Sequence, residues 1–252
     1  MTHALVTGAD SGIGAAIAKR LAASGMKVSL AGRRREPLEA VAAALGDAAL
    51  VLDGFDVTNE VAILKGLEQA RAVFGPIGVL VNNAGEAPSA PFEKTELALW
   101  EKILDVDLTG VFRVTKAVMG DIKAQGKMGR IINVASTAGL TGYPYVSAYC
   151  AAKHGVVGLT RALALELART GVTVNAVCPG FTDTPLLGKA VDTIVAKTGR
   201  TPEEARASLA SANPQGRLVT PEEVADTVLW LASEGAASIN GQAIAIAGGE
   251  VL

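Results

Sequence analysis

Seven short apolar runs, separated by longer segments with helical periodicity, constrain the fold of this chain more than any other feature. The runs are rich in Val, Leu, Ile and Ala and alternate little with polar residues, as do strands that are covered on both faces. Because predicted strands alternate with predicted helices, right-handed crossovers place the strands in one parallel sheet with helices on both faces. The predicted strands are Ala4–Thr7, Val28–Ala31, Leu50–Asp53, Val79–Asn82, Ile131–Ala135, Val172–Val177 and Ala243–Ala247.

The segments between these runs carry apolar residues at the three- and four-residue spacing of a helix. Ile13, Ile17 and Leu21 form such a stripe after the first run. No linker, low-complexity tract or repeat interrupts the 252 residues. We therefore predict a single α/β domain over residues 1–252, built on a doubly wound, seven-stranded parallel sheet.

Composition excludes several functional classes. The chain is 50% hydrophobic, and its 23 basic and 25 acidic residues leave a net charge of −2, which argues against a disordered chain and against a nucleic-acid binder. No apolar run approaches the length of about 18 residues that a membrane span needs, and we expect neither a signal peptide nor a metal site. Cys150 and Cys178 cannot form a disulfide framework, which predicts a reducing cytoplasm.

One segment departs from the strand–helix alternation. From Thr184 to Arg217 there is no strand pattern, only helical pieces such as Pro202–Leu209. The segment follows the sixth predicted strand at the carboxyl edge of the sheet, where open α/β folds bind ligands. We predict a substrate lid over residues 185–217; the alternative is a surface ornament without a function.

A glycine-rich turn links the first predicted strand to the first predicted helix. Gly8 allows a tight turn, Gly12 allows backbone to approach a pyrophosphate, and Gly14 allows the helix to pack closely on the strand. The N–H groups at the start of the helix favour a phosphate. The residues predicted to bind a dinucleotide here are Gly8, Asp10, Ser11, Gly12, Ile13 and Gly14.

Arginines follow the second predicted strand, where NAD-preferring folds commonly carry an acidic residue that holds the ribose. Gly32 makes room, and the guanidinium of Arg33 can hold a 2′-phosphate through charge-assisted hydrogen bonds. The pattern favours NADP over NAD as the cofactor. The alternative is that Arg33 and its two arginine neighbours only form a solvated start to the next helix.

Two further strand ends carry candidate cofactor contacts. Asp56, followed by Val57, either accepts a hydrogen bond from adenine or caps the next helix. Asn83, Ala84 and Gly85 suit a loop that passes close to a cofactor, although an ordinary turn has the same composition.

A tyrosine and a lysine carry the predicted chemistry. Tyr149 and Lys153 lie four residues apart at the start of a predicted helix, so both side chains project from one face. A phenol has a pKa of about 10, and a nearby ammonium lowers this pKa by stabilising the phenolate. The pair can therefore exchange a proton with an alcohol or a carbonyl. Ser136, at the end of the fifth predicted strand, can hold the same substrate oxygen.

Taken in order, five motifs make the whole chain resemble the short-chain dehydrogenase/reductase family. They are Thr7-Gly8-x-x-x-Gly12-Ile13-Gly14, Asn82-Asn83-Ala84-Gly85, Ser136, Tyr149-x-x-x-Lys153 and Cys178-Pro179-Gly180-Phe181-Thr182-Asp183-Thr184.

The resemblance implies a Rossmann fold, a nicotinamide cofactor and a homotetramer, or else a homodimer. By position, Tyr149 is the general acid/base, Lys153 lowers its pKa and binds the nicotinamide ribose, and Ser136 polarises the substrate carbonyl. The loop after the sixth strand is implied to contact the nicotinamide carboxamide and diphosphate. Its expected cofactor-binding residues are Pro179, Gly180, Thr182 and Thr184.

One position departs from the family pattern. The family usually has Asn in the helix after the fourth strand, where it anchors a water in a proton relay to the lysine, and this chain has Asp107. Asp107 falls inside the apolar stripe of that helix, so it needs a partner or a proton. Lys153 or a bound water can serve as the partner. We expect the relay to survive; the alternative is that the carboxylate raises the Tyr149 pKa and slows the chemistry.

The resulting functional hypothesis is an NAD(P)-dependent oxidoreductase that interconverts a ketone and a secondary alcohol, a small-molecule substrate. Leu108–Ala117 and Gly155–Thr184 look most like 3-oxoacyl (acyl-carrier-protein or CoA) and polyketide ketoreductases. The first alternative is an NAD-dependent dehydrogenase of 3-hydroxybutyrate, 3-hydroxyacyl-CoA or a cyclic or aryl secondary alcohol. The second is a catalytically silent, dinucleotide-binding regulator, which only Asp107 favours.

The predicted lid carries basic residues that are candidates for contacting an anionic carboxylate or a CoA phosphate. The alternative is that they are solvated charges on its surface. The residues are Lys189, Lys197, Arg200, Arg206 and Arg217.

Overall fold

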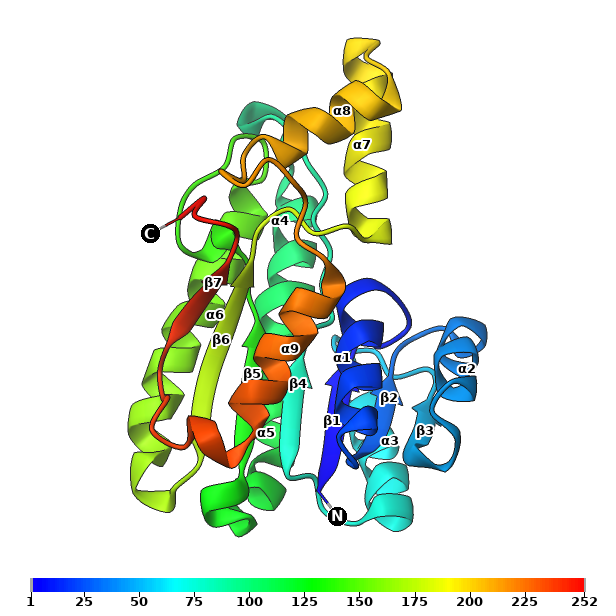
Figure 1. Ribbon diagram of the computed structural model, residues 1–252, viewed down its shortest axis with the longest axis vertical. Helices are drawn as coiled ribbons and strands as arrows, with labels where there is room; N and C mark the ends of the chain where they lie inside the picture. Colours follow the sequence, from blue (N-terminus) through cyan, green and yellow to red (C-terminus); the bar gives the residue numbers. More distant parts are fainter. Residues whose placement is uncertain (1, 252) are drawn as a thin grey trace.

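The computed structural model describes residues 2–251 and places all seven predicted strands in one parallel sheet (Figure 1). The strand order is β3-β2-β1-β4-β5-β6-β7. The strands are β1 (His3–Thr7), β2 (Lys27–Ala31), β3 (Ala49–Leu52), β4 (Val79–Asn82), β5 (Arg130–Val134), β6 (Thr173–Pro179) and β7 (Ala243–Ile246).

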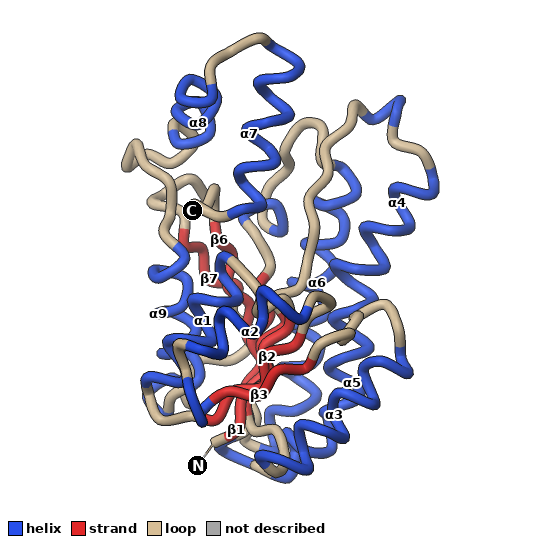
Figure 2. Tube along the Cα trace, turned by 90° about the vertical axis from the view of Figure 1, so that its right-hand side faces the viewer, coloured by secondary structure: helices blue, strands red, loops and turns tan. Residues whose placement is uncertain are grey.

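Helices cover both faces of the sheet (Figures 1 and 2). The helices are α1 (Gly12–Ala23), α2 (Arg35–Ala43), α3 (Glu60–Phe74), α4 (Leu97–Leu104), α5 (Gly110–Ala124), α6 (Ser147–Leu167), α7 (Pro185–Thr198), α8 (Pro202–Ala210) and α9 (Pro221–Ala232). Apolar side chains of α1, α2 and α9 form one core layer, and those of α3, α5 and α6 form the other.

Strand β1 shows why the runs are continuously apolar. Ala4 and Val6 belong to the core layer under α1 and α9, whereas Leu5 belongs to the layer under α3 and α5. Successive side chains of a strand point to opposite faces, so a strand covered on both faces buries every residue. The doubly wound architecture that the sequence predicts is therefore confirmed.

The strand order reverses between β1 and β4. Strand β1 pairs with β2 on one side and with β4 on the other, both in parallel. Connections on the two sides of this point leave in opposite directions, which opens a crevice at the carboxyl ends of the strands. The glycine turn after β1 and the Asn83–Gly85 loop after β4 meet there.

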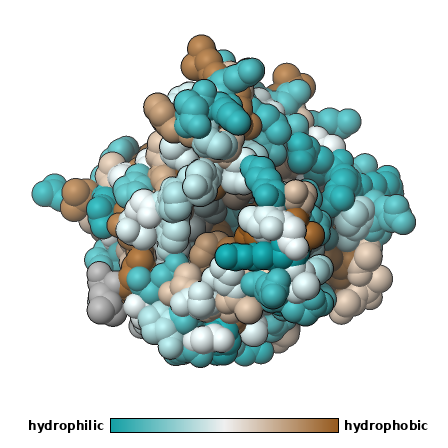
Figure 3. All heavy atoms as spheres, turned by 90° about the horizontal axis from the view of Figure 1, so that it is seen from above, coloured by the Kyte–Doolittle hydropathy of each residue, from teal (hydrophilic) through white to brown (hydrophobic). Residues whose placement is uncertain are grey.

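The segment 185–217 is helical, as its sequence predicts, and lies beyond the carboxyl ends of the strands (Figure 1). Thr184 caps α7 by accepting a hydrogen bond from the Leu187 N–H, and Thr201 and Glu204 form a capping box at α8. Figure 3 looks onto this end of the molecule, where polar and apolar side chains are mixed. Helix α7 is longer than the short pieces expected from the sequence.

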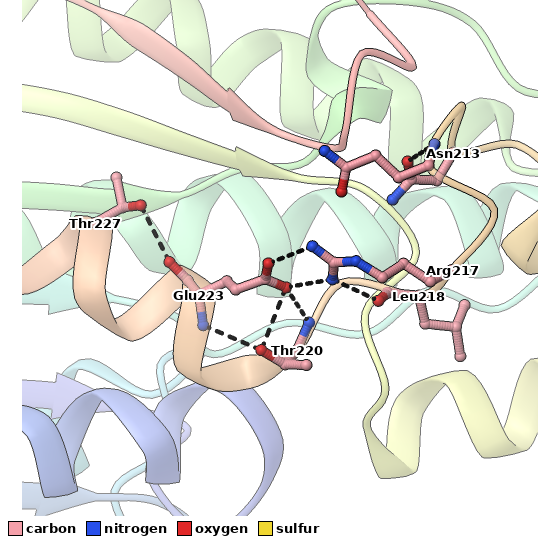
Figure 4. Close-up of polar contacts among 7 residues, drawn as sticks. Asn213, Arg217, Leu218, Thr220, Glu223 and Thr227 are labelled. Carbon is pink, nitrogen blue, oxygen red and sulfur yellow. Dashed lines mark hydrogen bonds and ion pairs between the residues drawn. The ribbon is translucent and has the colours of Figure 1, made fainter.

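A polar cluster anchors the chain where it leaves this segment and enters α9 (Figure 4). The Arg217 guanidinium binds both carboxylate oxygens of Glu223, at 2.6 and 2.9 Å, and Thr220 completes a capping box with Glu223. A cavity of about 220 Å³ lies beside this cluster and is bordered by residues 245–248, which span the end of β7. The cluster therefore ties one end of the segment to the start of α9.

Candidate active site

The glycine turn is shaped for close approach of a ligand. Gly8 has a φ of +62°, in the left-handed region that glycine adopts without strain. A Cβ on Gly14 would overlap the Gly8 carbonyl oxygen and lie 2.5 Å from Asn83 Nδ2, so only glycine fits there. At the start of α1, Ser11 makes no side-chain capping hydrogen bond, and the first turn holds no acidic residue. The turn therefore fits the phosphates of a dinucleotide.

The predicted loop after β4 supports this turn directly. Asn83 Nδ2 donates to the carbonyl oxygens of Thr7 and Gly8, at 2.9 and 3.0 Å. Thr7 Oγ1 in turn accepts the N–H groups of Asn83 and Ala84. The Asn83 amide therefore holds the glycine turn in shape. Thr7 is a member of this network that the sequence did not indicate, because its partners lie more than seventy residues away.

Only one of the three consecutive arginines lacks an ion-pair partner within residues 2–251. Arg34 donates to Asp10 Oδ2 at 2.7 Å, which ties the start of α2 to the glycine turn. Arg35 binds Glu39 at 2.7 Å. The exposed Arg33 side chain is the one left available for an anion. Sequence reasoning did not foresee that Asp10 pairs with Arg34.

Asp56 does not cap the helix that follows it. Its Oδ1 accepts the N–H and the hydroxyl of Thr58, at 2.9 and 2.7 Å, while the side chain of Asn59 caps α3. Burial alone would raise the pKa of Asp56, but the hydrogen bonds from Thr58 and the charge of Arg33 bring this pKa below its usual value. Asp56 is thus an anionic acceptor near Arg33, followed by the buried side chain of Val57.

The loop after β6 approaches the glycine turn from the opposite side. A Cβ on Gly12 would lie 3.1 Å from Thr184 Cγ2. Thr182 donates its hydroxyl to the Gly180 carbonyl, and Thr184 donates to the Thr182 carbonyl. Strand β6 extends to Pro179, beyond its predicted end, because its last residues pair with β7. The structure thus brings the expected cofactor residues 179–184 to the crevice.

Tyr149, Lys153 and Ser136 converge at the carboxyl end of β5. Tyr149 and Lys153 lie in the first turns of α6, with Lys153 Nζ 5.5 Å from the centre of the Tyr149 ring. Ser136, just after β5, is close enough to the Tyr149 hydroxyl to lower its pKa. Lys153 Nζ also donates to the Val134 carbonyl at 3.1 Å. Tyr149 and Lys153 thus lie on one helix face, while their catalytic roles stay a prediction.

Asp107 completes a buried ion pair with Lys153. It is fully buried in a π-helical turn, Asp105–Thr109, between α4 and α5, and its Oδ1 lies 3.3 Å from Lys153 Nζ. The Glu86 N–H donates to both carboxylate oxygens, at 3.3 and 3.2 Å. Gly85 allows this approach, because a Cβ there would lie 2.5 Å from Asp107 Oδ1. Nothing in the sequence indicates the π turn. The apolar stripe around Asp107, in contrast, indicates that this residue faces inward.

The electrostatics of the site differ from the simple expectation. Burial raises the pKa of Tyr149, and the charge of Asp107 adds to this, while Lys153 and the Ser136 hydrogen bond only partly oppose it. Burial would lower the pKa of Lys153, but the neighbouring Asp107 carboxylate outweighs this and raises it. Lys153 therefore stays protonated. Its lowering effect on the Tyr149 pKa is present but smaller than the effect of burial.

The arrangement can hold a carbonyl oxygen and deliver a proton to it. The Ser136 and Tyr149 hydroxyls are both able to hydrogen-bond such an oxygen. Cys178, on β6 nearby, is not a nucleophile at neutral pH, because burial raises its pKa to about 11. Within residues 2–251, no group of three metal-ligating acidic, His or Cys side chains occurs, and no helix is long and apolar enough to cross a bilayer.

Two of the five basic residues of the predicted lid are ion-paired within the protein, so only part of the expected positive charge is available to an anionic substrate. Arg206 is ion-paired with Asp183, and Arg217 with Glu223. The exposed Lys189, Lys197 and Arg200 form no ion pair within residues 2–251. These three residues therefore remain candidates for contacting an anionic part of a substrate.

Comparison with known proteins gives a consistent result. Residues 2–194 match a family model described as short chain dehydrogenase. A Streptomyces coelicolor protein provisionally named a ketoacyl reductase is 43% identical over 98% of this chain and 95% of its own. A D-beta-hydroxybutyrate dehydrogenase of Cupriavidus necator is 41% identical over 94% of this chain and 93% of its own.

Among solved structures, a crystal structure of a variant actinorhodin polyketide ketoreductase with NADPH superimposes with a TM-score of 0.93. The two chains are 40% identical, and the match covers 99% of this chain and 97% of the other.

Proposed function

Because the chain belongs to the short-chain dehydrogenase family, we propose that it reduces the ketone of a 3-oxoacyl thioester, carried by acyl carrier protein or CoA, with NADPH. Family membership makes it an oxidoreductase that uses NAD(P) to interconvert a ketone and a secondary alcohol. The observation that carries the proposal is the convergence of Tyr149, Lys153 and Ser136 beside the glycine-lined crevice.

The three side chains take distinct roles in this proposal. Ser136 and Tyr149 hydrogen-bond the substrate carbonyl oxygen, and Tyr149 donates its phenolic proton as negative charge develops on that oxygen. Lys153 stabilises the phenolate that remains. Asp107 acts through Lys153, which it keeps protonated and in place. In the oxidative direction the proton moves back from the alcohol to Tyr149.

The chain's residues fit a nicotinamide dinucleotide. The cradle at Gly8–Gly14 receives the diphosphate, the loops at Asn83–Gly85 and Pro179–Thr184 flank the crevice, and Asp56 and Val57 border the adenine end. The bound dinucleotide supplies the hydride. Arg33 supports a preference for NADPH, because its neighbouring arginines are already ion-paired whereas Arg33 has no ion-pair partner within residues 2–251.

A second candidate function runs in the oxidative direction. The relative from Cupriavidus necator is named a D-beta-hydroxybutyrate dehydrogenase, and its match covers nearly the whole of both chains. An NAD-dependent dehydrogenase of 3-hydroxybutyrate, a 3-hydroxyacyl thioester or a cyclic alcohol would use the same proton path through Tyr149. A preference for NADH over NADPH would favour this candidate.

The remaining features of the proposal concern the whole molecule. Residues 185–217 act as a lid over the substrate, since they follow β6 directly beside the crevice. The chain assembles as a homotetramer or homodimer, which the half-exposed Phe112 and exposed Leu97 on α5 and α4 support. It works in a reducing cytoplasm, consistent with its two unpaired cysteines, Cys150 and Cys178.

The test is a substrate panel followed by nicotinamide absorbance. We expect acetoacetyl-CoA and longer 3-oxoacyl thioesters to be reduced with NADPH at a higher kcat/KM than with NADH. Cyclic ketones serve as the comparison. No turnover of any 3-oxoacyl compound with either dinucleotide would refute the proposed substrate class.

A further inference from the structure

Three segments that are distant in sequence meet around one carboxylate. The Tyr143 hydroxyl, in the loop before α6, lies 2.5 Å from Glu250 Oε1 and 2.8 Å from Thr137 Oγ1. Glu250 belongs to the tail that follows β7. Because a phenol has one proton, Tyr143 donates it to the carboxylate and accepts from the Thr137 hydroxyl. The short tail is thereby fastened to the loop that precedes the catalytic tyrosine.

The negative charge of Glu250 has little to neutralise it. Glu250 forms no ion pair with any residue in the range 2–251, and its buried Oε2 makes no hydrogen bond there. A Cβ on Gly180 would lie 2.6 Å from this oxygen, so the backbone of the β6 loop packs against it. The Phe181 ring lies edge-on to Tyr143, 6.0 Å between ring centres, and adds an apolar wall.

Two contacts link this carboxylate to segments that carry or border the catalytic groups. Thr137, which bonds Tyr143, directly follows Ser136, and Gly180 belongs to the loop that borders the crevice. Burial raises the pKa of Tyr143, and its hydrogen bond to Glu250 raises it further, so Tyr143 stays protonated and adds no charge of its own. Tyr143 therefore holds the Glu250 carboxylate against the loop that borders the crevice, and this carboxylate has no cationic partner within residues 2–251.

We propose that Glu250 determines substrate specificity by excluding ketones and alcohols that carry a free carboxylate close to the reacting carbon. An anion at the substrate position would meet a like charge in a region of low dielectric constant, whereas an ester or thioester of the same acyl group would not. This inference rests on the proposed function and narrows it: the substrate is neutral around the ketone, as a 3-oxoacyl thioester is. Acetoacetate and 3-hydroxybutyrate are disfavoured.

The experiment compares acetoacetate with ethyl acetoacetate, which share the reacting ketone and differ in the charge of the far end. Reduction with saturating NADPH is measured for the wild-type protein and for Glu250→Gln, whose amide oxygen still accepts from Tyr143. The expected result is a wild-type preference for the ester that falls about tenfold or more in Glu250→Gln, because kcat/KM for acetoacetate rises. The ester should change less than about threefold. Glu166→Gln, an exposed carboxylate far along α6, is the matched control and should leave the preference unchanged.

The outcomes separate the two proposals. An ester-to-anion preference that is the same in wild type and Glu250→Gln overturns the role of Glu250 while leaving the proposed function standing. Equal losses with both substrates also overturn it, because a merely structural residue would affect both alike. A wild-type protein that does not reduce ethyl acetoacetate also overturns this inference, whereas the proposed function is refuted only if acetoacetyl-CoA and longer 3-oxoacyl thioesters are not reduced either.

Discussion

Replacing Asp107 by Asn tests whether the buried carboxylate carries a negative charge that acts on the catalytic phenol. Lys153 Nζ lies 3.3 Å from Asp107 Oδ1 and 5.5 Å from the centre of the Tyr149 ring. The carboxylate oxygen is therefore at most about 9 Å from the ring, and at an effective dielectric constant of about 20 a unit charge there disfavours the phenolate by about 2 kcal/mol. Asn keeps an oxygen that accepts the Glu86 N–H, so the main change is the loss of charge.

The sign of the effect follows from the state of Tyr149 that each reaction direction needs. To accept a proton from an alcohol, Tyr149 must be a phenolate. Burial and then the Asp107 charge hold its pKa above the usual value, so Asp107→Asn lowers that pKa. The acidic limb of the pH profile for alcohol oxidation then moves to lower pH, with a gain in kcat/KM of about tenfold or more on that limb. Asp107 also raises the pKa of Lys153, so Asp107→Asn lowers that pKa. The alkaline limb, where Lys153 loses its proton, therefore moves to lower pH as well.

The assay is the pH dependence of kcat/KM in both directions, followed by nicotinamide absorbance. The maximal rate should stay within about two orders of magnitude of wild type. The matched control is Asp105→Asn, in the same π turn, because Asp105 pairs with Arg113 and its side chain is 41% exposed. Coincident profiles for wild type and Asp107→Asn would show that the carboxyl is neutral and refute the reasoning, and complete inactivation would contradict the expected survival of the relay.

Three further substitutions test the cofactor cradle and the base of α9. Arg33→Ala should lower kcat/KM for NADPH by about ten- to a hundredfold through loss of a charge-assisted hydrogen bond, with kcat/KM for NADH little affected. The control is Arg35→Ala, because Arg35 is ion-paired within the protein. Equal losses with both cofactors in Arg33→Ala would contradict this prediction. Gly14→Ala should lower the free energy of unfolding by about 1–3 kcal/mol, because the new Cβ overlaps the Gly8 carbonyl; an unchanged melting temperature would count against it. Hydrogen bonds with Arg217 lower the Glu223 pKa from 4.5 to about 2, so this stabilisation is present above the unfolded value and is lost as pH falls from 4.5 towards 2. Glu223→Gln should therefore lose less stability than wild type in acid, and parallel acid denaturation curves would contradict this.

The fold was predictable because its signals are local and repeated. The seven strands are found within two residues of their predicted ends, and β6 is longer only because its last residues pair with β7, a contact that no local pattern reveals. The start of helix α7 is clear from its Thr184 cap and from Pro185. Its length was harder to predict, because the exposed face of the helix leaves few apolar residues to mark the helical period.

The candidate site was predictable where function depends on spacing along one element. Tyr149 and Lys153 share a helix face, and Gly14 must approach Gly8, so short-range spacing sufficed. The partners that tune the site come from distant segments. The pairing of Tyr143 with Glu250, more than one hundred residues apart, depends on tertiary packing that a single sequence does not encode visibly.

The most direct test of the account is Tyr149→Phe, which removes one oxygen and leaves the cofactor cradle intact. We predict that turnover of the preferred ketone falls by about 10²–10⁴-fold, the contribution of a general acid, while the Kd for NADPH, followed by its fluorescence, changes by less than about threefold. Turnover within about tenfold of wild type, in a variant that still binds NADPH normally, would contradict the claim that Tyr149 delivers the proton.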